Sequence, residues 1–354
     1  MNREITMKAL IYHGPNLLAL EEKPKPTIID ATDAIVRITT TTICGTDLHI
    51  LKGDVPSVSD GRVLGHEGVG VIEAVGKRVE NFSVGDKVLI SLITSCGRCS
   101  YCKKGMYSHC RIGGWLLGNS IDGTQAEYVR IPFADTGLFL LSPEVDEEAA
   151  VMLSCILPTG LECGALSGQV KPGDSVAIVG AGPVGLAALL AVQLYSPARI
   201  IMIDLDDHRL AVARSLGATE VINSSDGTAA KQVMALTHET GVDVVIEAVG
   251  IAATFAICQE IIAPGGHIAN VGVHGTPVEL HLEKLWAANI TLTTRLVDAG
   301  STPMLLGMVQ SGRIAAKKLV SHRFALQDII KAYDTFANGA KEQAIKVIIK
   351  GDVQ

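Results

Sequence analysis

Four cysteines fall within one fifteen-residue window, and their spacing is typical of a metal site. The sulfur atoms belong to Cys96, Cys99, Cys102 and Cys110. Four thiolates can enclose a tetrahedral zinc ion, and such a closed shell leaves no position for a substrate. The window therefore predicts a structural zinc. A [4Fe–4S] cluster is the main alternative, because it also takes four cysteines. Four basic neighbours are expected to help keep the thiolates ionised: Arg98, Lys103, Lys104 and Arg111.

A second set of metal-binding side chains is spread over three segments. Cys44 lies in ICGTDLH, His66 and Glu67 lie in GHEG, and Cys155 opens CILPTG. Sulfur and imidazole are ligands that zinc prefers, and a catalytic zinc keeps one position open beside three protein ligands. Taken singly, each cysteine could be a small buried apolar group, and His66 could be a hydrogen-bonded core histidine. Their combination indicates a catalytic metal.

The segment Gly180-Ala181-Gly182-Pro183-Val184-Gly185 has the pattern GxGxxG. A β-branched run, SVAIV, precedes it and an apolar helical stretch follows. In this context the first glycine permits a tight turn, the second lets a pyrophosphate approach, and the third lets helix and strand pack closely. The free N–H groups of the helix N-terminus then face the phosphates. The pattern predicts a dinucleotide site.

Asp204 ends the next apolar run, RIIMID, nineteen residues after Gly185. Its carboxylate would accept hydrogen bonds from the adenosine ribose and repel a 2′-phosphate, which favours NAD over NADP. Arg209 could instead neutralise a phosphate, fold over the ribose, or lie on a solvated helix face. The competing interpretation of the whole motif is a tight turn with a helix-capping aspartate.

The elements that must position these groups change character near residue 150. Before it, short apolar runs such as DAIVRITTTTICG, GVGVIEAVG and DKVLISLI alternate with turn residues, which predicts a β-rich domain. After it, strands and helices alternate, beginning with SVAIVG and PVGLAALLAVQLY, which predicts a parallel sheet. The tail contains a helix, DIIKAYDTFANG, and a final strand, AIKVIIKG. That tail could join either domain, although its strand suits the β-rich one.

Composition bounds the function. The chain has 354 residues, 48% of them hydrophobic and 19% charged, with a net charge of −7. An acidic chain with only 4% aromatic residues does not suit nucleic-acid binding. Residues 175–198 carry no charge and are long enough to span a bilayer, but their glycines favour a buried strand, turn and helix. The N-terminus has no signal-peptide pattern, and we expect a cytoplasmic protein without a membrane partner.

Together the motifs resemble a family. The stretches ICGTDLH, GHEGVGVIEAVG, CILPTG and VAIVGAGPVG, with the four-cysteine window, resemble zinc-dependent medium-chain alcohol dehydrogenases over essentially the whole chain. WLLGNSIDGTQAEYV and LVSHRF are most similar to the bacterial secondary-alcohol dehydrogenases. The resemblance implies an α/β protein with a β-rich GroES-like catalytic domain and a Rossmann domain with a doubly wound parallel sheet. We expect the first at 1–155 and 297–354, with a zinc lobe at 94–112, and the second at 156–296.

The resemblance also implies roles for individual residues. Cys44, His66 and Cys155 match the catalytic-zinc ligands, and Glu67 matches a carboxylate that can exchange onto the metal. Asp47 matches the group that orients the metal-bound histidine. The implied activity is hydride transfer between NAD(H) and a small or medium alcohol, ketone or aldehyde, with secondary alcohols favoured and two zinc ions per subunit.

Thr46 matches the hydroxyl that contacts the substrate oxygen, and His49 matches the outer end of a proton relay. Thr159 and Gly160 match the segment beside the nicotinamide. Further cofactor contacts are expected at Val249, Val271 and Val273.

Substrate contacts and partners are the remaining expectations. Ile93, Trp115 and Leu157 could line an apolar pocket, although Trp115 could equally pack the lobe against its domain. Polyol and threonine dehydrogenases carry the same motifs and stay as alternatives, as does a non-catalytic zinc and dinucleotide sensor. The resemblance implies a homotetramer, and residues 285–297 could pair strands across a subunit interface, or form an internal edge strand.

Overall fold

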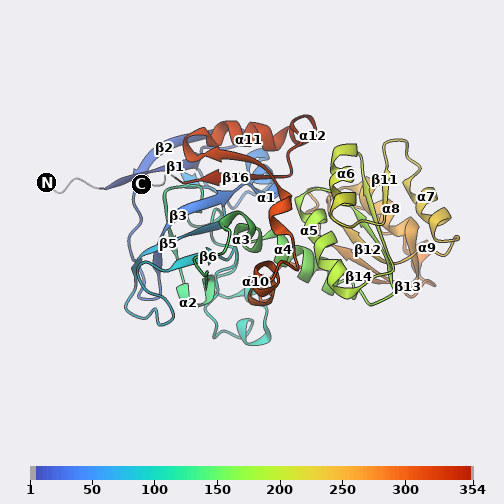
Figure 1. Cartoon of the computed structure of the whole chain (residues 1–354), viewed down its shortest axis with the longest axis horizontal. Helices are drawn as coiled ribbons and strands as arrows, with labels where there is room; N and C mark the ends of the chain where they lie inside the picture. The colour runs from blue at the N-terminus through green and yellow to red at the C-terminus, as the bar shows by residue number, and fades with distance from the viewer. Residues whose placement is uncertain (1–4, 352–354) are drawn as a thin grey trace. The chain divides into compact units, whose positions relative to one another are not determined.

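The computed structural model describes residues 5–351, which contacts divide into two units. One unit contains the described residues up to Cys155 and those from Asp298 onward, and the other is Ile156–Val297. The chain thus leaves the first unit once and returns to it (Figure 1).

Strands dominate the first unit. They form a three-stranded sheet in the order β2-β1-β4 and a larger sheet in the order β15-β16-β3-β5-β6-β8, with β7 also paired to β3. The strands are β1 (Thr6–Tyr12), β2 (Leu18–Pro24), β3 (Ala34–Thr42), β4 (Arg62–Val63), β5 (Gly68–Val75), β6 (Lys87–Ile90), β7 (Tyr128–Ile131), β8 (Leu138–Leu140), β15 (Val320–Ala325) and β16 (Lys346–Lys350).

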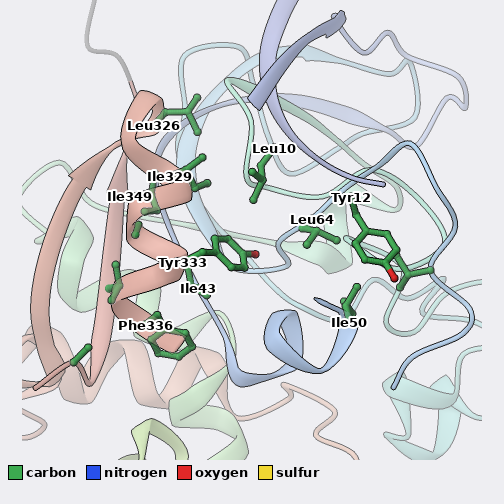
Figure 2. Packing of buried hydrophobic residues seen from close by; sticks show 14 residues of the cluster. Leu10, Tyr12, Ile43, Ile50, Leu64, Leu326, Ile329, Tyr333, Phe336 and Ile349 are labelled. Atoms are coloured by element: carbon green, nitrogen blue, oxygen red, sulfur yellow. The ribbon is translucent and has the colours of Figure 1, made fainter. Parts of the chain in front are cut away.

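The helices of this unit are short. They are α1 (Gly45–Lys52), α2 (Ala134–Gly137), α3 (Glu147–Ala150), α10 (Thr302–Gln310), α11 (Ile329–Ala337) and α12 (Gly339–Glu342), with 3₁₀ turns η1 (Cys102–Lys104), η2 (Tyr107–His109), η3 (Val151–Leu153), η6 (Ala316–Leu319) and η7 (Leu326–Asp328). Ile329, Tyr333 and Phe336 of α11 recur at helical spacing and are buried. They pack with Leu10 of β1 and Ile43 in one apolar cluster (Figure 2).

The larger sheet brings distant segments together at one end of its inner strands β16, β3 and β5. The strand β3 pairs antiparallel with both β5 and β16, matching Thr41 with Gly68 and Thr42 with Ile348. Antiparallel pairing places the end of one strand beside the start of its neighbour. The residues that follow β3, precede β5 and begin β16 are therefore neighbours, and these are the segments of Cys44, His66 and Lys346.

The second unit is built on a six-stranded parallel sheet in the order β11-β10-β9-β12-β13-β14. Its strands are β9 (Ser175–Val179), β10 (Arg199–Asp204), β11 (Glu220–Asn223), β12 (Val242–Glu247), β13 (Ile262–Asn270) and β14 (Thr291–Thr294). Its helical segments are α4 (Ile156–Thr159), a π-helix η4 (Gly160–Leu166), α5 (Pro183–Val192), η5 (Gln193–Tyr195), α6 (Asp207–Ser215), α7 (Ala229–Leu236), α8 (Ala252–Ile261) and α9 (Leu282–Leu285).

Helices cover both faces of this sheet. Val245 of β12 packs in the cluster that includes Val233 of α7 and Cys258 of α8. The next residue, Ile246, points to the other face, where it lies against Gly164 of η4. Because side chains alternate along a strand, this is the doubly wound Rossmann arrangement that the family resemblance implies. The βαβ rhythm correctly predicted its parallel sheet.

The observed elements can be compared with three further predictions from the sequence. The uncharged segment 175–198 forms β9, α5 and η5, so the strand-turn-helix interpretation is confirmed. The final strand β16 pairs with β3 of the first unit. Within the expected interface segment, β14 is the edge strand of the parallel sheet.

Among residues 5–351, no single helix is long and apolar enough to cross a membrane. One bent pair of consecutive helical segments, Glu147–Leu153 and Ile156–Leu166, meets the length and composition limits for a broken span.

Candidate metal centre and dinucleotide site

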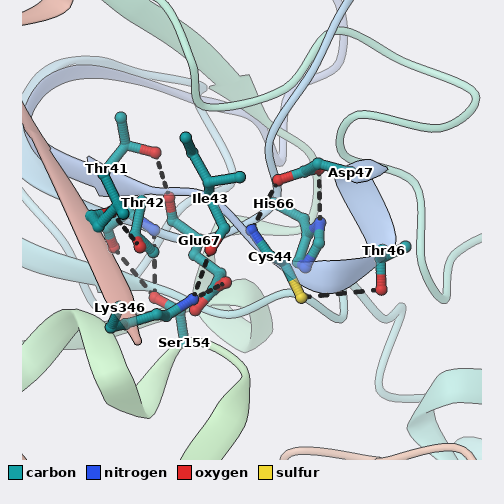
Figure 3. Close-up of polar contacts among 12 residues, drawn as sticks. Thr41, Thr42, Ile43, Cys44, Thr46, Asp47, His66, Glu67, Ser154 and Lys346 are labelled. Carbon is teal, nitrogen blue, oxygen red and sulfur yellow. Dashed lines mark hydrogen bonds and ion pairs between the residues drawn. The ribbon is translucent and has the colours of Figure 1, made fainter. Parts of the chain in front are cut away.

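Four buried side chains converge at the end of the sheet where β3 finishes and β5 and β16 begin. One ligand atom from each of Cys44, His66, Glu67 and Cys155 lies within 4.8 Å of all the others. All four residues are buried, and Figure 3 shows three of them, Cys44, His66 and Glu67. Their chain positions are far apart, and the sheet pairing described above brings the first three together.

The local fold around Cys44 favours a negatively charged sulfur. Cys44 is the N-cap of α1, with extended backbone, and its side chain accepts from the N3 backbone N–H. Asp47 at N3 reaches back to the Cys44 N–H at 2.9 Å, so the two form a capping box. A helix N-terminus carries a partial positive charge, which stabilises a thiolate at this position.

The electrostatics of the cluster separate its two thiols. A hydrogen bond from Cys155 holds the pKa of Cys44 well below its usual range, and the nearby charge of His66 acts in the same direction. The same hydrogen bond raises the pKa of Cys155 well above its usual range. Burial disfavours charging of His66, but the hydrogen bond to Cys44 and the negative charges of Cys44, Asp47 and Glu67 together raise the pKa of His66 to about 9.

These residues fit a zinc ion. Two buried atoms of the cluster, His66 Nδ1 and Glu67 Oε2, have no hydrogen-bond partner among the described residues. His66 Nδ1 lies 3.7 Å from Asp47 Oδ1, which leaves Nε2 as the ligand atom. Sulfur, imidazole and carboxylate are the donor types that zinc takes, and a cation would replace the protons that the metal-free groups hold.

Asp47 is held in place by residues that the sequence analysis did not single out. Gln125 is fully buried, and its Nε2 donates to Asp47 Oδ2 at 3.1 Å. The Tyr333 hydroxyl donates to Gln125 Oε1 at 2.8 Å. A hydrogen-bonded chain therefore runs from α11 to the carboxylate beside His66. The only sequence feature that included Gln125 was the stretch TQAEYV, and it served as part of the family resemblance, not as evidence for a site residue.

Lys346 is a second residue that the sequence analysis missed. Its Nζ donates to Glu67 Oε1 at 2.6 Å and to the Ile43 carbonyl at 3.0 Å. Burial raises the pKa of Glu67 to about 7, although Lys346 acts in the opposite direction. A lone lysine inside the apolar strand AIKVII was the available signal.

Thr46 and His49 lie on α1, one helical turn apart. Thr46 Oγ1 is 3.7 Å from Cys44 Sγ. His49 is partly exposed, and its Nδ1 is 2.9 Å from Asp54 Oδ2. A carboxylate only accepts, so Nδ1 is the donor and Nε2 remains free to accept a proton.

The four-cysteine window forms a second compact cluster. The ligand atoms of Cys96, Cys99, Cys102 and Cys110 also lie within 4.8 Å of one another. Sγ–Sγ distances are 3.5 Å for Cys99–Cys102 and 4.0 Å for Cys96–Cys102. Zn–S bonds of about 2.3 Å in a tetrahedron imply sulfur separations of roughly 3.8 Å. The sulfurs therefore fit a single zinc ion better than a larger four-iron cube.

Backbone groups lower the pKa of Cys99 in this cluster, whereas burial raises the pKa of Cys102 to about 12. The N–H groups of Cys102 and then Arg111 lower the pKa of Cys99 to about 6. The expected contribution of basic side chains is not what sets this value. His109 lies outside this group of ligand atoms, and its Nδ1 is 2.9 Å from the Ser108 hydroxyl.

The glycine loop of the second unit has no room for side chains at two of its positions. Gly180 has a φ of +108°, and a Cβ there would lie 2.5 Å from Val249 Cγ2. A Cβ at Gly185 would lie 1.8 Å from the Gly180 carbonyl oxygen. At Gly182, by contrast, the nearest atom is Arg209 Nη1 at 3.9 Å. The first and third glycines are thus required by packing, and the second leaves backbone open, as pyrophosphate binding needs.

The helix α5 begins at Pro183 and Val184 with Gly182 as N-cap, so its first N–H groups are not capped by a side chain. Asp204 ends β10, and its Oδ2 accepts from Ala181 N–H at 2.6 Å. It does not cap the following helix, because Asp206 is the N-cap of α6. The Nε atom of Arg209 lies 3.9 Å from Oδ2 of Asp206.

The remaining expected cofactor residues lie at the carboxyl ends of neighbouring strands. Val249 follows β12 and is exposed, and Val271 and Val273 follow β13. Because β9 lies between β10 and β12, the chain reverses its winding there, which is where doubly wound folds bind ligands. Thr159 ends α4, immediately before the π-helix η4.

The expected pocket residues are placed as follows. Ile93 and Leu157 are buried, the first in the β-rich unit and the second in α4. Trp115 packs against the apolar cluster around α11, donates from Nε1 to the Leu117 carbonyl, and presents its ring at 6.1 Å from His66, edge to face. Trp115 is therefore a packing residue that also borders a metal-ligand candidate.

Family models match both units. The alcohol dehydrogenase GroES-like domain matches residues 30–140, and the zinc-binding dehydrogenase domain matches residues 183–310. The chain is 37% identical over 369 residues to an alcohol dehydrogenase of Cupriavidus necator, covering 97% of this chain and 98% of that one. It is 34% identical over 338 residues to the NADP-dependent isopropanol dehydrogenase of Thermoanaerobacter brockii, covering 93% and 95%.

A solved structure agrees with these matches. The zinc-dependent alcohol dehydrogenase 2 of Streptococcus pneumonia, in its apo form, superposes with a TM-score of 0.94 at 55% identity, covering 98% of this chain and 99% of that one. Fold, ligand clusters and relatives together define the class: the chain belongs to the zinc-dependent medium-chain alcohol dehydrogenase family. The family resemblance drawn from the sequence is confirmed.

Proposed function

We propose that this enzyme oxidises small or medium secondary alcohols, and reduces the matching ketones, with NAD(H) and a zinc ion held by Cys44, His66 and Cys155. The observation that carries the proposal is the convergence of these three ligand atoms with that of Glu67 within 4.8 Å. A second zinc at the four-cysteine cluster makes two per subunit.

The chain's own residues then do the following. When bound, zinc supplies a Lewis acid that acidifies the alcohol hydroxyl, and the nicotinamide ring accepts the hydride. Thr46 accepts the hydroxyl proton beside Cys44. His49 accepts it at Nε2 at the partly exposed end of the relay, because Asp54 fixes Nδ1 as the donor. Asp47 keeps His66 oriented.

Two features support NAD as the cofactor. Asp204 carries a negative charge at the end of β10, where it would meet the adenosine ribose and repel a 2′-phosphate. Its hydrogen bond to Ala181 also ties it to the glycine loop. The Thermoanaerobacter relative is named as NADP-dependent, so the two cofactors are compared in the experiment below.

The substrate assignment rests on the relative named for isopropanol and on the apolar ring of Trp115, whose centroid lies 6.1 Å from that of His66. Residues on and near the edge strand β14, among them Leu292, Leu296 and the largely exposed Trp286, support pairing with a second copy and a homotetramer. All eight cysteines are free thiols, which supports a reducing, cytoplasmic location.

The test is absorbance at 340 nm with zinc-loaded protein. We expect turnover with NAD and 2-propanol, weaker turnover with sorbitol or threonine, and kcat/KM at least tenfold higher with NAD than with NADP. Asp204→Asn keeps a hydrogen-bond acceptor and removes the charge. It should therefore lower the ratio of kcat/KM with NAD to kcat/KM with NADP. Sorbitol or threonine as the best substrate would favour the polyol or amino-alcohol alternative. No turnover on a broad panel would contradict the proposal.

A further inference from the structure

Lys346 is an unusual residue for the position it occupies. It begins β16 and is fully buried, the one lysine of the described chain in that class. Its Nζ donates to Glu67 Oε1 at 2.6 Å and to the Ile43 carbonyl at 3.0 Å. A buried ammonium needs such partners, because taking a charge out of water is costly.

Glu67 is fixed at one end and open at the other. Two threonine hydroxyls, from Thr41 and Thr124, donate to its backbone carbonyl at 2.7 Å each. Lys346 binds one carboxylate oxygen, whereas Oε2 is buried without a hydrogen-bond partner among the described residues. In Figure 3, Glu67 lies between Lys346 and His66.

This arrangement matters because a catalytic zinc needs an open position. Glu67 belongs to the same group of ligand atoms, within 4.8 Å, as the two sulfurs and the imidazole. A carboxylate that bound the metal firmly would complete a closed four-ligand shell, which is the form of a structural site. Something must therefore hold the Glu67 carboxylate back, and Lys346 is the cation that contacts it.

We propose that Lys346 is a positioning residue that competes with the metal for the Glu67 carboxylate. It keeps Glu67 as a weak, displaceable ligand and so keeps the fourth position available to the alcohol. The proposal rests on the zinc site proposed above. It predicts that loss of the ammonium tightens the metal site while slowing catalysis, which a merely structural ion pair would not do.

The experiment compares wild type with Lys346→Met, Glu67→Gln and the double variant. Lys350→Met is the matched control, since Lys350 ends the same strand and is partly exposed. Zinc release to a colorimetric chelator is measured in each, and Cys44→Ala identifies the release phase of this site. Visible spectra of the Co²⁺-substituted proteins report whether a carboxylate oxygen joins the metal.

We expect zinc release from Lys346→Met to slow by about tenfold, the lower end for groups that act on a metal through its ligands. The Co²⁺ spectrum should change and kcat should fall, while Lys350→Met stays like wild type. The double variant should release zinc at the rate of Glu67→Gln, because Lys346 acts only through Glu67.

Two results would overturn the proposal. One is zinc release from Lys346→Met that is unchanged or faster. The other is a difference between the double variant and Glu67→Gln, a comparison that holds even if Lys346→Met fails to fold, since the double variant leaves no unpaired buried carboxylate. A wild type that binds no zinc at this site would instead refute the proposed function.

Discussion

The two sulfur clusters of the first unit are made from similar groups in opposite ways. Cys96, Cys99, Cys102 and Cys110 come from one loop, and two of them are only partly buried. The second cluster joins three distant segments in a fully buried place and mixes sulfur, imidazole and carboxylate. The first is a closed all-sulfur shell. The second has a carboxylate that Lys346 holds by one oxygen, and that difference separates a site suited to structure from one suited to chemistry.

The surroundings of the clusters differ as well. Around the loop, backbone N–H groups lower the pKa of Cys99. Around the buried cluster, side chains from α1, β16 and α11 supply the hydrogen bonds: Asp47, Lys346, and Tyr333 through Gln125. Backbone amides come with any tight loop, whereas side-chain networks need particular residues at particular places. The buried cluster is therefore the more sensitive of the two to distant substitutions.

The sharpest way to break this comparison is to remove one sulfur from the buried cluster. Cys44→Ala should lower kcat/KM by roughly 10³-fold, because a Lewis acid contributes several kcal/mol to such a reaction. Zinc content should fall by one ion per subunit. Cys258→Ala, which removes a buried thiol outside both clusters, is the control. Undiminished activity in the Cys44 variant would show that the buried cluster is not the catalytic site.

A second test asks whether chemistry beside the buried cluster depends on Thr46. Thr46→Val removes the hydroxyl and keeps the shape, so kcat should fall by about 10²–10⁴-fold, as for loss of a proton-transfer group. Both zinc ions and the melting temperature should be retained. Thr240→Val, on an exposed turn, is the matched control. Normal turnover in the zinc-loaded Thr46 variant would reject the relay.

The loop cluster should respond in stability rather than in chemistry. Cys99→Ala should reduce the free energy of unfolding by about 3 kcal/mol, which is what crosslinking a loop of this length contributes. One zinc ion should be lost, while kcat per folded molecule changes little. Thermal unfolding and metal analysis measure both. A large fall in kcat with unchanged stability would contradict a structural role.

The smallest effect concerns pH. The pKa of Cys99 is lowered to about 6, so its thiolate is present above that pH and is lost as the pH falls through it. The rate at which metal-free Cys44→Ala protein captures zinc at the loop should therefore drop below pH about 6. Stopped-flow zinc capture from pH 5 to 8 measures this. A Lys103→Ala and Lys104→Ala double variant should keep the same midpoint, and a raised midpoint would show that side-chain cations control the thiolate.

Much of this architecture could be predicted from local patterns. GxGxxG between an apolar strand and an apolar helix predicts a βαβ turn because its glycines are demanded by neighbours within the same motif: Gly185 by the Gly180 carbonyl, and Gly180 by a positive φ. The position of Asp204 also follows from the length of one strand-helix unit. Its contact with the Ala181 N–H and the capping role of Asp206 do not, because they depend on how the loop closes in space.

By itself, the sequence determined the four-cysteine cluster, the alternation of strands and helices, and membership of the family. Each of these depends on motifs whose residues lie close together along the chain. The sequence indicated the group of Cys44, His66, Glu67 and Cys155 only through its combined motifs and the family resemblance, and the tertiary structure alone decided that Lys346 and the Gln125–Tyr333 pair contact its members and their neighbours. The physical reason is the antiparallel pairing of β3 with β5 and β16, which brings to one buried edge groups that no spacing along the chain connects.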